Sequence, residues 1–185
     1  MSEFTCHHLL PGEAATLFPL MREAVPGLEL KTWLRFTRRI NTPRRAAQCG
    51  IIVVQRRARP MPCGLFVYHR EEDLTHGPTL VAEHLVALDL LDPAPVIRAL
   101  IGELDRLAKE LGCSAIRAFV LGQESLVATE LREAGHRPEG ATLWKRSLGD
   151  DNGLRQGMAA CWPAERGYFA AAWRGASNPI GVLLL

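Results

Sequence analysis

The sequence predicts an α+β domain in which a mixed, mostly antiparallel sheet is flanked by helices, giving three layers. Two β-branched or aromatic runs, 50–55 and 63–69, are joined by an Arg/Pro-rich link and predict an antiparallel hairpin. A strong helical period over residues 96–111 predicts a long amphipathic helix. The order strand, helix, strand over residues 115–145 predicts a right-handed crossover and therefore a parallel strand pair.

The composition indicates one folded domain followed by a tail. The chain has 185 residues, of which 48% are hydrophobic and 23% charged, with a formal net charge of +2. These values are typical of a globular domain and argue against a disordered or fibrous chain. We expect the domain at residues 1–148. Residues 149–185 are rich in Ala and Gly and show no sustained period, so we expect a tail that is poorly ordered or docks on a hydrophobic surface or a partner chain, as in a homodimer.

Several classes of protein are excluded at this stage. No apolar run approaches the roughly 20 residues that span a bilayer, and the first residues lack the pattern of a signal peptide. The five cysteines are far apart, and no two have the spacing of zinc or redox motifs. We therefore expect a cytoplasmic protein with buried, reduced thiols, no metal and no membrane partner.

The N-terminal part is expected to hold a short strand and two helices. Residues 4–10 are partly β-prone, and apolar side chains then recur at helical spacing from Leu17 to Val25. A second helical run begins at Leu30 and stops at Asn41-Thr42-Pro43.

Residues 31–59 carry many arginines and no acidic residue. This basic segment could attract an anion, or it could be a solvated cationic face. Nucleic acid is not an expected partner, because only Trp33 and Phe36 supply interleaved aromatic rings on the predicted second helix.

The second half of the chain contains the strongest signals. A polar loop, 71–78, precedes a buried central strand at 79–88, which Glu83 and His84 interrupt. Asp92 and Pro93 suit the start of the long helix, and Gly112 suits its end. A strand at 115–121, a helix at 125–134 stopped by Gly135, and a last strand at 141–145 complete the prediction.

The order of elements over residues 4–148 resembles the GNAT N-acetyltransferase family. The most specific part is Glu83-His-Leu-Val-Ala-Leu88, which leads into the helix closing with Lys109-Glu-Leu-Gly-Cys113. A strand follows, and then a helix that ends Arg132-Glu-Ala-Gly-His136-Arg-Pro-Glu-Gly140. The resemblance implies a splayed sheet, open between strands 79–88 and 115–121, that binds acetyl-CoA and transfers an acetyl or other acyl group to a small-molecule or peptide amine. The implied cofactor contacts are Leu85, Val86, Ala87, Leu88, Ala94, Val96, Ile97 and Arg98.

One loop departs from the family pattern. The family's Arg/Gln-x-x-Gly-x-Gly/Ala loop presents N–H groups to a pyrophosphate at a helix N-terminus. The equivalent here is Asp92-Pro93-Ala94-Pro95-Val96-Ile97. Pro93 and Pro95 have no N–H, and the carboxylate of Asp92 would occupy the anion position. Arg98 or the basic segment could compensate. The alternative is a non-catalytic GNAT-fold binding or regulatory module whose CoA loop has degenerated.

Two residues are candidates for the catalytic base. Glu83 and His84 are the ionisable pair inside the predicted central strand, and successive strand residues point to opposite faces. We expect Glu83 to take the amine proton, with His84 in that role if the strand has the other register. In the structural alternative, one faces solvent or a helix N-terminus and the other is a hydrogen-bonded core group. The family's usual acid, a tyrosine, corresponds to Leu131 here, which leaves Tyr68 as a weak substitute.

Overall fold

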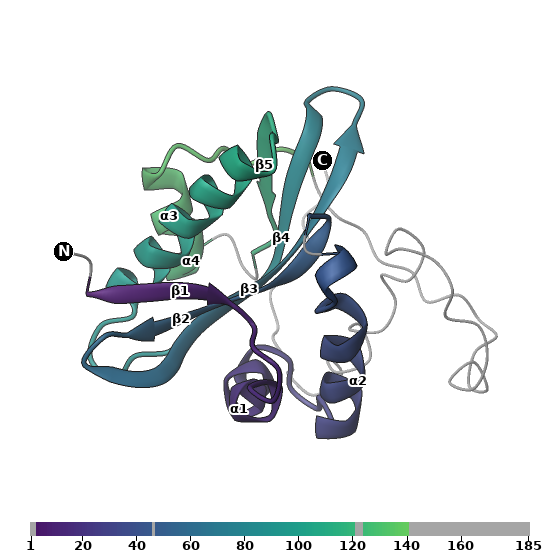
Figure 1. Cartoon of the computed structure of the whole chain (residues 1–185). Coiled ribbons are helices and arrows are strands. Elements are labelled where there is room, and N and C mark those ends of the chain that lie inside the picture. The colour runs from purple at the N-terminus through teal and green to yellow at the C-terminus, as the bar shows by residue number, and fades with distance from the viewer. Residues whose placement is uncertain (1–2, 46, 121–123, 141–185) are drawn as a thin grey trace, which may run out of the picture.

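The computed structural model describes residues 3–45, 47–120 and 124–140, and these form a mixed sheet covered by helices on both faces (Figure 1). The elements are β1 (Phe4–His8), α1 (Ala14–Ala24), α2 (Leu30–Ile40), a 3-10 turn η1 (Pro43–Arg45), β2 (Cys49–Arg56), β3 (Arg59–Asp73), β4 (Gly77–Ala87), α3 (Ala94–Glu110), β5 (Ala115–Ala118) and α4 (Leu126–Glu133). The predicted α+β class is confirmed.

The described strands form one sheet in the order β1-β2-β3-β4-β5. The first four strands pair antiparallel with their neighbours. β4 and β5 are parallel, because α3 carries the chain back across the sheet between them. The predicted mixed, mostly antiparallel sheet with one parallel pair is therefore confirmed.

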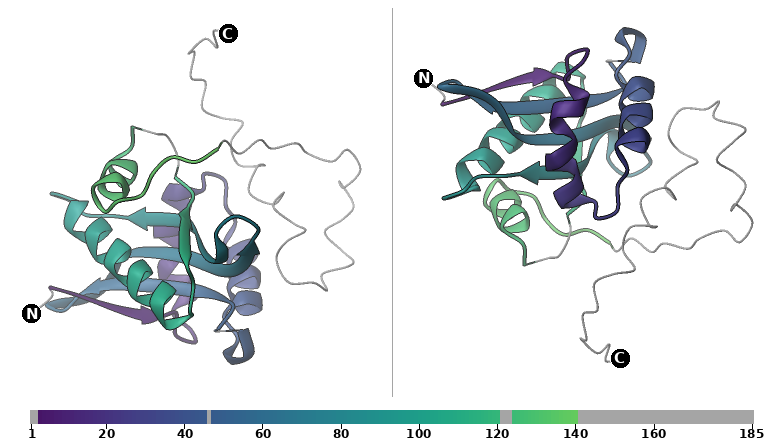
Figure 2. Two further views of the ribbon diagram at one scale, coloured as in Figure 1. Left: turned by 90° about the horizontal axis from the view of Figure 1, so that it is seen from above. Right: turned by 90° about the horizontal axis from the view of Figure 1, so that it is seen from below.

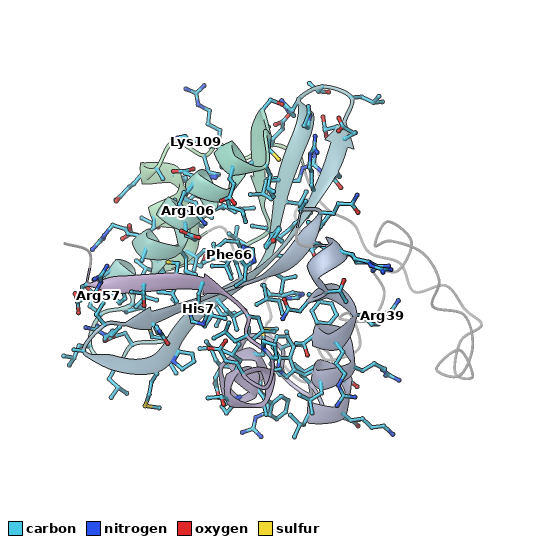
Figure 3. The ribbon with its side chains drawn as sticks, in the orientation of Figure 1. His7, Arg39, Arg57, Phe66, Arg106 and Lys109 are labelled. Carbon is cyan, nitrogen blue, oxygen red and sulfur yellow. The ribbon has the colours of Figure 1, made fainter. Side chains whose placement is uncertain are left out.

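Alternating side chains of the strands build two apolar layers. On one face, Ile52, Val54, Phe66 and Tyr68 pack with Leu80 and Ala82 against α3. On the other face, Ile51, Val53, Leu65 and Val67 pack against α1 and α2. Figure 2 shows α3 across one side of the sheet and α1 with α2 across the other. In Figure 3, Phe66 lies in the interior beside α3, whereas Arg39 extends outward from α2.

The two N-terminal helices are tied to each other and to β1 by side-chain hydrogen bonds. Trp33 is fully buried, and its Nε1 donates to the carbonyl of Ala14 at 2.6 Å. Asn41, which follows α2, donates from Nδ2 to the carbonyl of Leu9 at 2.6 Å. These contacts hold α1 and α2 as one layer.

β3 is longer than the sequence predicts, and the predicted loop at 71–78 is mostly strand. Asp73 accepts from the N–H groups of Thr75 and His76 at 2.8 and 2.9 Å. These bonds close a tight turn that connects β3 to β4. Arg117 of β5 bonds to both Glu71 and Asp73. Glu71 and Asp73 thus stay in the sheet because Arg117 of β5, on the far side of β4, pairs with their charges.

The remaining sequence predictions concern the strand at 115–121 and the segments beyond residue 140. The described part of β5 ends at Ala118, so the strand is shorter than the predicted 115–121. The predicted strand at 141–145 and the predicted tail at 149–185 lie outside the described residues. In the described residues, no helix is both long and apolar enough to cross a bilayer.

Gly64 of β3 is the point of closest approach between the sheet and α3. A Cβ at this position would lie 2.9 Å from Cγ1 of Val96, 3.0 Å from Cδ1 of Leu100 and 3.1 Å from the carbonyl oxygen of Val86. We expect Gly64→Ala to lower the free energy of unfolding by about 1–3 kcal/mol in urea denaturation, because the buried side chains and backbone must shift.

Gly102 supplies the matched control for this prediction. It lies inside α3, and an added Cβ would meet no atom within 4 Å. Gly102→Ala should therefore raise the free energy of unfolding by about 0.5–1 kcal/mol through helix propensity. Equal stabilities for Gly64→Ala and the parent chain would contradict the packing described for α3.

Candidate functional site

β5 pairs with only the first part of β4. Pairing covers Thr79–Ala82 of β4 and Ala115–Ala118 of β5, and the N–H of Phe119 then donates to the carbonyl of Ala82 at 2.9 Å. β4 continues to Ala87 with β3 alone as its partner among the described residues. We call the side of residues 83–87 that faces away from β3 the open edge of β4. The splayed parallel pair is thus present.

An apolar cluster packs against both strands on the side of α3 and α4. This cluster is centred on Ile97, Ile101 and Leu131, and Leu85, Ala87, Ala118, Val120 and Val127 pack against it. Both strands contribute to it, so burial of this surface favours the separation of their ends. A molecule lying along the open edge would therefore have an apolar wall on this side.

A β-bulge interrupts β4 at His84. Val67 pairs with Glu83 and Leu65 pairs with Val86, so Phe66 stands opposite both His84 and Leu85. His84 has a φ of 51°, the one positive φ among the described non-glycine residues. Because of the extra residue, Glu83 and Val86 share the face covered by α1 and α2, while Leu85 and Ala87 face α3.

The two candidate bases differ in environment. Glu83 is partly buried next to Val67 on the face of α1 and α2. His84 is also partly buried, and desolvation lowers its pKa to about 4. The imidazole is therefore neutral at pH 7. A general base works best with a pKa near the working pH, so a pKa of about 4 makes His84 a poor proton acceptor at pH 7.

The loop that joins β4 to α3, residues 88–93, contains two carboxylates that bond to its own backbone. Asp89 accepts from the N–H groups of Leu91 and Asp92 at 3.0 and 3.3 Å. Asp92 accepts from the N–H of Ala94 at 2.9 Å. Asp92 precedes the cap position, which Pro93 occupies, and is not the cap residue predicted from the sequence. We call residues 88–93 the carboxylate loop.

The diphosphate of CoA does not fit this loop as the structure has it. The backbone N–H groups of Leu91, Asp92 and Ala94 already donate to the side chains of Asp89 and Asp92. Both of these side chains are negatively charged carboxylates. At 4 Å and an effective dielectric constant of about 20, two like unit charges repel by about 4 kcal/mol, which exceeds the roughly 1 kcal/mol net gain of a hydrogen bond. The repulsion between a diphosphate and a loop carboxylate therefore exceeds the gain from a hydrogen bond to an N–H group that remains available.

The predicted cofactor contacts at the start of α3 are also occupied or buried. The N–H of Ile97 donates to the carbonyl of Pro93 at 3.0 Å, within the helix. Val96 has a fully buried side chain against Gly64. Arg98 donates to Glu130 of α4 at 2.9 Å. Leu88, the first residue after β4, is exposed, and its N–H donates to the carbonyl of Cys63.

Sequence reasoning missed Asp89 and its partner. Arg56, at the end of β2, donates from Nη2 to Oδ2 of Asp89 at 2.5 Å and also bonds to Glu3. Hydrogen bonds from Leu91 and then Arg56 hold the pKa of Asp89 below its ordinary value. An acidic residue two positions before an exposed Leu91 is a signal for a side-chain turn. The contact with Arg56 spans 33 residues and carries no local signal.

The candidate acid Tyr68 is buried in the layer beneath α3. Its hydroxyl lies 3.5 Å from Nδ1 of His8, and burial raises its pKa far above the ordinary value. Leu131 belongs to the apolar cluster between β4 and β5. Neither residue supplies an accessible proton at neutral pH.

Cys6, Cys63 and Cys113 are unreactive because of their environment. Burial raises the pKa of Cys6 to about 11, and it also raises the pKa of Cys63 and Cys113. Thiols with such pKa values carry little thiolate at pH 7. In the described part of the chain, no group of three or more His, Cys, Asp or Glu residues is placed to hold a metal ion.

The basic segment forms an outer surface on α2. Lys31, Arg35 and Arg38 line a shallow hollow with the apolar side chains of Leu30 and Leu34. In residues 3–45, 47–120 and 124–140, no carboxylate forms an ion pair with these three cations. This face lies across the sheet from α3 and its carboxylate loop.

Comparison with solved structures places the chain in the GNAT fold. Glucosamine-6-phosphate N-acetyltransferase from Arabidopsis thaliana superposes with a TM-score of 0.63 at 14% identity, covering 77% of this chain and 97% of that chain. Aminoglycoside N-acetyltransferase AAC(6')-Iy in complex with CoA gives 0.64 at 14% identity, with 80% and 97% covered. The predicted resemblance in fold is confirmed.

The GNAT fold also occurs in a protein with a different description. A transcriptional regulator from Bacillus halodurans C-125 superposes with a TM-score of 0.66 at 15% identity, covering 78% of this chain and 99% of that chain. No protein-family model matches the sequence, and no curated protein matches it. At these identities the similarity establishes the fold alone.

The low pKa of the His84 imidazole leads to a prediction about how the free energy of unfolding depends on pH. Its pKa is about 4 in the folded chain and about 6.5 when unfolded, so the unfolded chain binds more protons between these values. We expect the free energy of unfolding to fall as pH is lowered from 6.5 to 4, by up to roughly 1.4 kcal/mol per pH unit from this group.

The comparison of two histidine variants tests this assignment. His84→Asn should flatten the acid-side slope measured by urea denaturation across pH 4–7, because asparagine tolerates a positive φ and does not titrate. His76→Asn, at an exposed turn, is the matched control. An unchanged slope in His84→Asn would show that another group causes the acid sensitivity.

Proposed function

We propose that this chain is a GNAT-fold N-acyltransferase that moves an acetyl or other acyl group from a CoA thioester to a primary amine. The open edge of β4 is the observation that carries the proposal. Within the described residues, the backbone of residues 85–87 lies beside an apolar wall, past the point where pairing with β5 ends at Ala82. An extended molecule with amide groups can pair with such an edge as an added strand does. The arm of CoA has amide groups of this kind.

Glu83 is assigned as the base. Acyl transfer needs a neutral amine, so a base must take the ammonium proton before the nitrogen attacks the thioester carbon. The C–N bond forms as the C–S bond breaks, and the departing thiolate takes its proton from solvent. Glu83 lies on the face covered by α1 and α2, away from the apolar wall formed with α3. This placement separates the amine side of β4 from the side that holds the apolar cluster. His84, with a pKa of about 4, instead shapes the strand at the bulge.

A second candidate function follows from the carboxylate loop. Its occupied N–H groups favour a non-catalytic GNAT-fold module that binds a partner, for example through the basic surface on α2. The two functions differ in thioester binding. A ligand at a hundred times its dissociation constant stabilises a protein by about 2.7 kcal/mol, so thermal melting with acetyl-CoA and with S-acetylpantetheine distinguishes them. A shift with either compound supports the transferase, and no shift with both supports the module.

The role of Glu83 is tested by Glu83→Gln. We expect this change to lower kcat by roughly 10²- to 10⁴-fold, the usual contribution of a general base, while thioester-induced stabilisation persists. Thiol release is followed with a panel of primary amines that includes glucosamine 6-phosphate and aminoglycosides, the acceptor classes named for the structural neighbours.

Glu72→Gln is the control for the loss of one negative charge. Glu72 is exposed on β3, where it pairs with Arg70. This variant should retain full turnover. Full turnover in Glu83→Gln would remove Glu83 from the mechanism, although the transferase assignment itself would remain.

A further inference from the structure

We infer that Asp89 and Asp92 exclude the diphosphate of an acyl donor from the start of α3, so that the donor is recognised by its acyl-pantetheine arm alone. Recognition of the arm rests on the proposed function. The exclusion of the diphosphate rests on the contacts of the carboxylate loop and can be tested without any turnover.

Five successive residues at this position offer no available N–H group. Leu91 and Asp92 donate to Asp89, Ala94 donates to Asp92, and positions 93 and 95 are prolines. A diphosphate would need several of these donors at once. Rearranging the backbone would release at most three of them, because prolines have none to release.

Asp89 is fixed in place by Arg56 at the end of β2. Its Oδ2 accepts from Arg56 at 2.5 Å, and Arg56 is itself bonded to Glu3, which precedes β1. The side chain of Asp89 is only 12% exposed. The low pKa that its hydrogen bonds produce keeps this carboxylate charged at neutral pH. The negative charge is therefore a permanent part of the folded domain.

The nearby cations are already engaged in ion pairs and are not available to a diphosphate. Arg56 already neutralises Asp89, and Arg98 bonds to Glu130, whose side chain is 8% exposed. A diphosphate would have to displace one of these ion pairs. Leaving Glu130 buried without a partner would be costly, so Arg98 is held by its own pair.

The first experiment compares two donors that share the arm and differ in the nucleotide diphosphate. We expect acetyl-CoA and S-acetylpantetheine to bind the unmodified chain with dissociation constants within about threefold of each other in isothermal titration calorimetry. A site that bound the diphosphate would bind acetyl-CoA about 100-fold or more tightly than S-acetylpantetheine. A preference of that size would overturn the inference.

The second experiment removes the carboxylates stepwise. Asp92→Gly frees the N–H of Ala94, and Asp89→Asn added to it removes the second charge while an amide oxygen still accepts the loop N–H groups. The double variant should bind acetyl-CoA about tenfold more tightly than the unmodified chain, with S-acetylpantetheine unchanged. Equal affinities for acetyl-CoA in the two proteins would contradict the inference. Melting curves establish that each variant is folded.

A charge control and an independent probe complete the test. Glu23→Gln with Glu29→Gln removes the same charge from the exposed surface around α1 and should change neither affinity. Inorganic pyrophosphate should bind the double variant and not the unmodified chain. If neither thioester binds any protein, the proposed function fails, and the pyrophosphate comparison still decides the inference: binding to the unmodified chain, or to neither protein, would refute it.

Discussion

The uneven strand pairing along β4 is the constraint on which the site depends. Its first half has β3 and β5 as neighbours, and its second half has β3 alone among the described residues. Arg117 bonds to Glu71 and Asp73, which holds β5 to the β3–β4 hairpin at the paired end. At the other end, Ile97, Ile101 and Leu131 of α3 and α4 pack against side chains of both strands on one face of the sheet, and no backbone pairing between β4 and β5 is found there among the described residues. The strands are therefore held together at one end and, within the described residues, unpaired at the other, which creates the open edge.

The open edge and the carboxylate loop follow each other along the chain but have opposite properties. Among the described residues, no strand pairs with residues 85–87 on the side away from β3, and apolar side chains lie next to this edge. The loop that follows has its N–H groups bonded and its anion position occupied by carboxylates. A donor with an amide-containing arm is compatible with the first feature, and a diphosphate is incompatible with the second. Under the proposed function, the edge can bind the arm of a thioester, whereas the loop does not accept its diphosphate.

The sequence predicted elements well where the signal is local. The helical period over 96–111 gave α3, and the order of strands and helices led to the GNAT resemblance that the solved structures confirm. It failed at 71–78, where polar residues suggested a loop and ion pairs with Arg117 keep much of the segment in the sheet. Glu83 and His84 were correctly placed on a strand, but the bulge was not foreseen because it depends on register with β3.

The sequence alone determined the chemistry available to the loop. Pro93 and Pro95 lack an N–H group in any fold, and Asp92 lies where a carboxylate can bond to the start of a helix. The tertiary structure decided which face Glu83 occupies and that Arg56 fixes Asp89. Both depend on pairing between residues distant in the chain, because strand register and ion pairs are set by packing across the sheet, whereas backbone donors are properties of each residue.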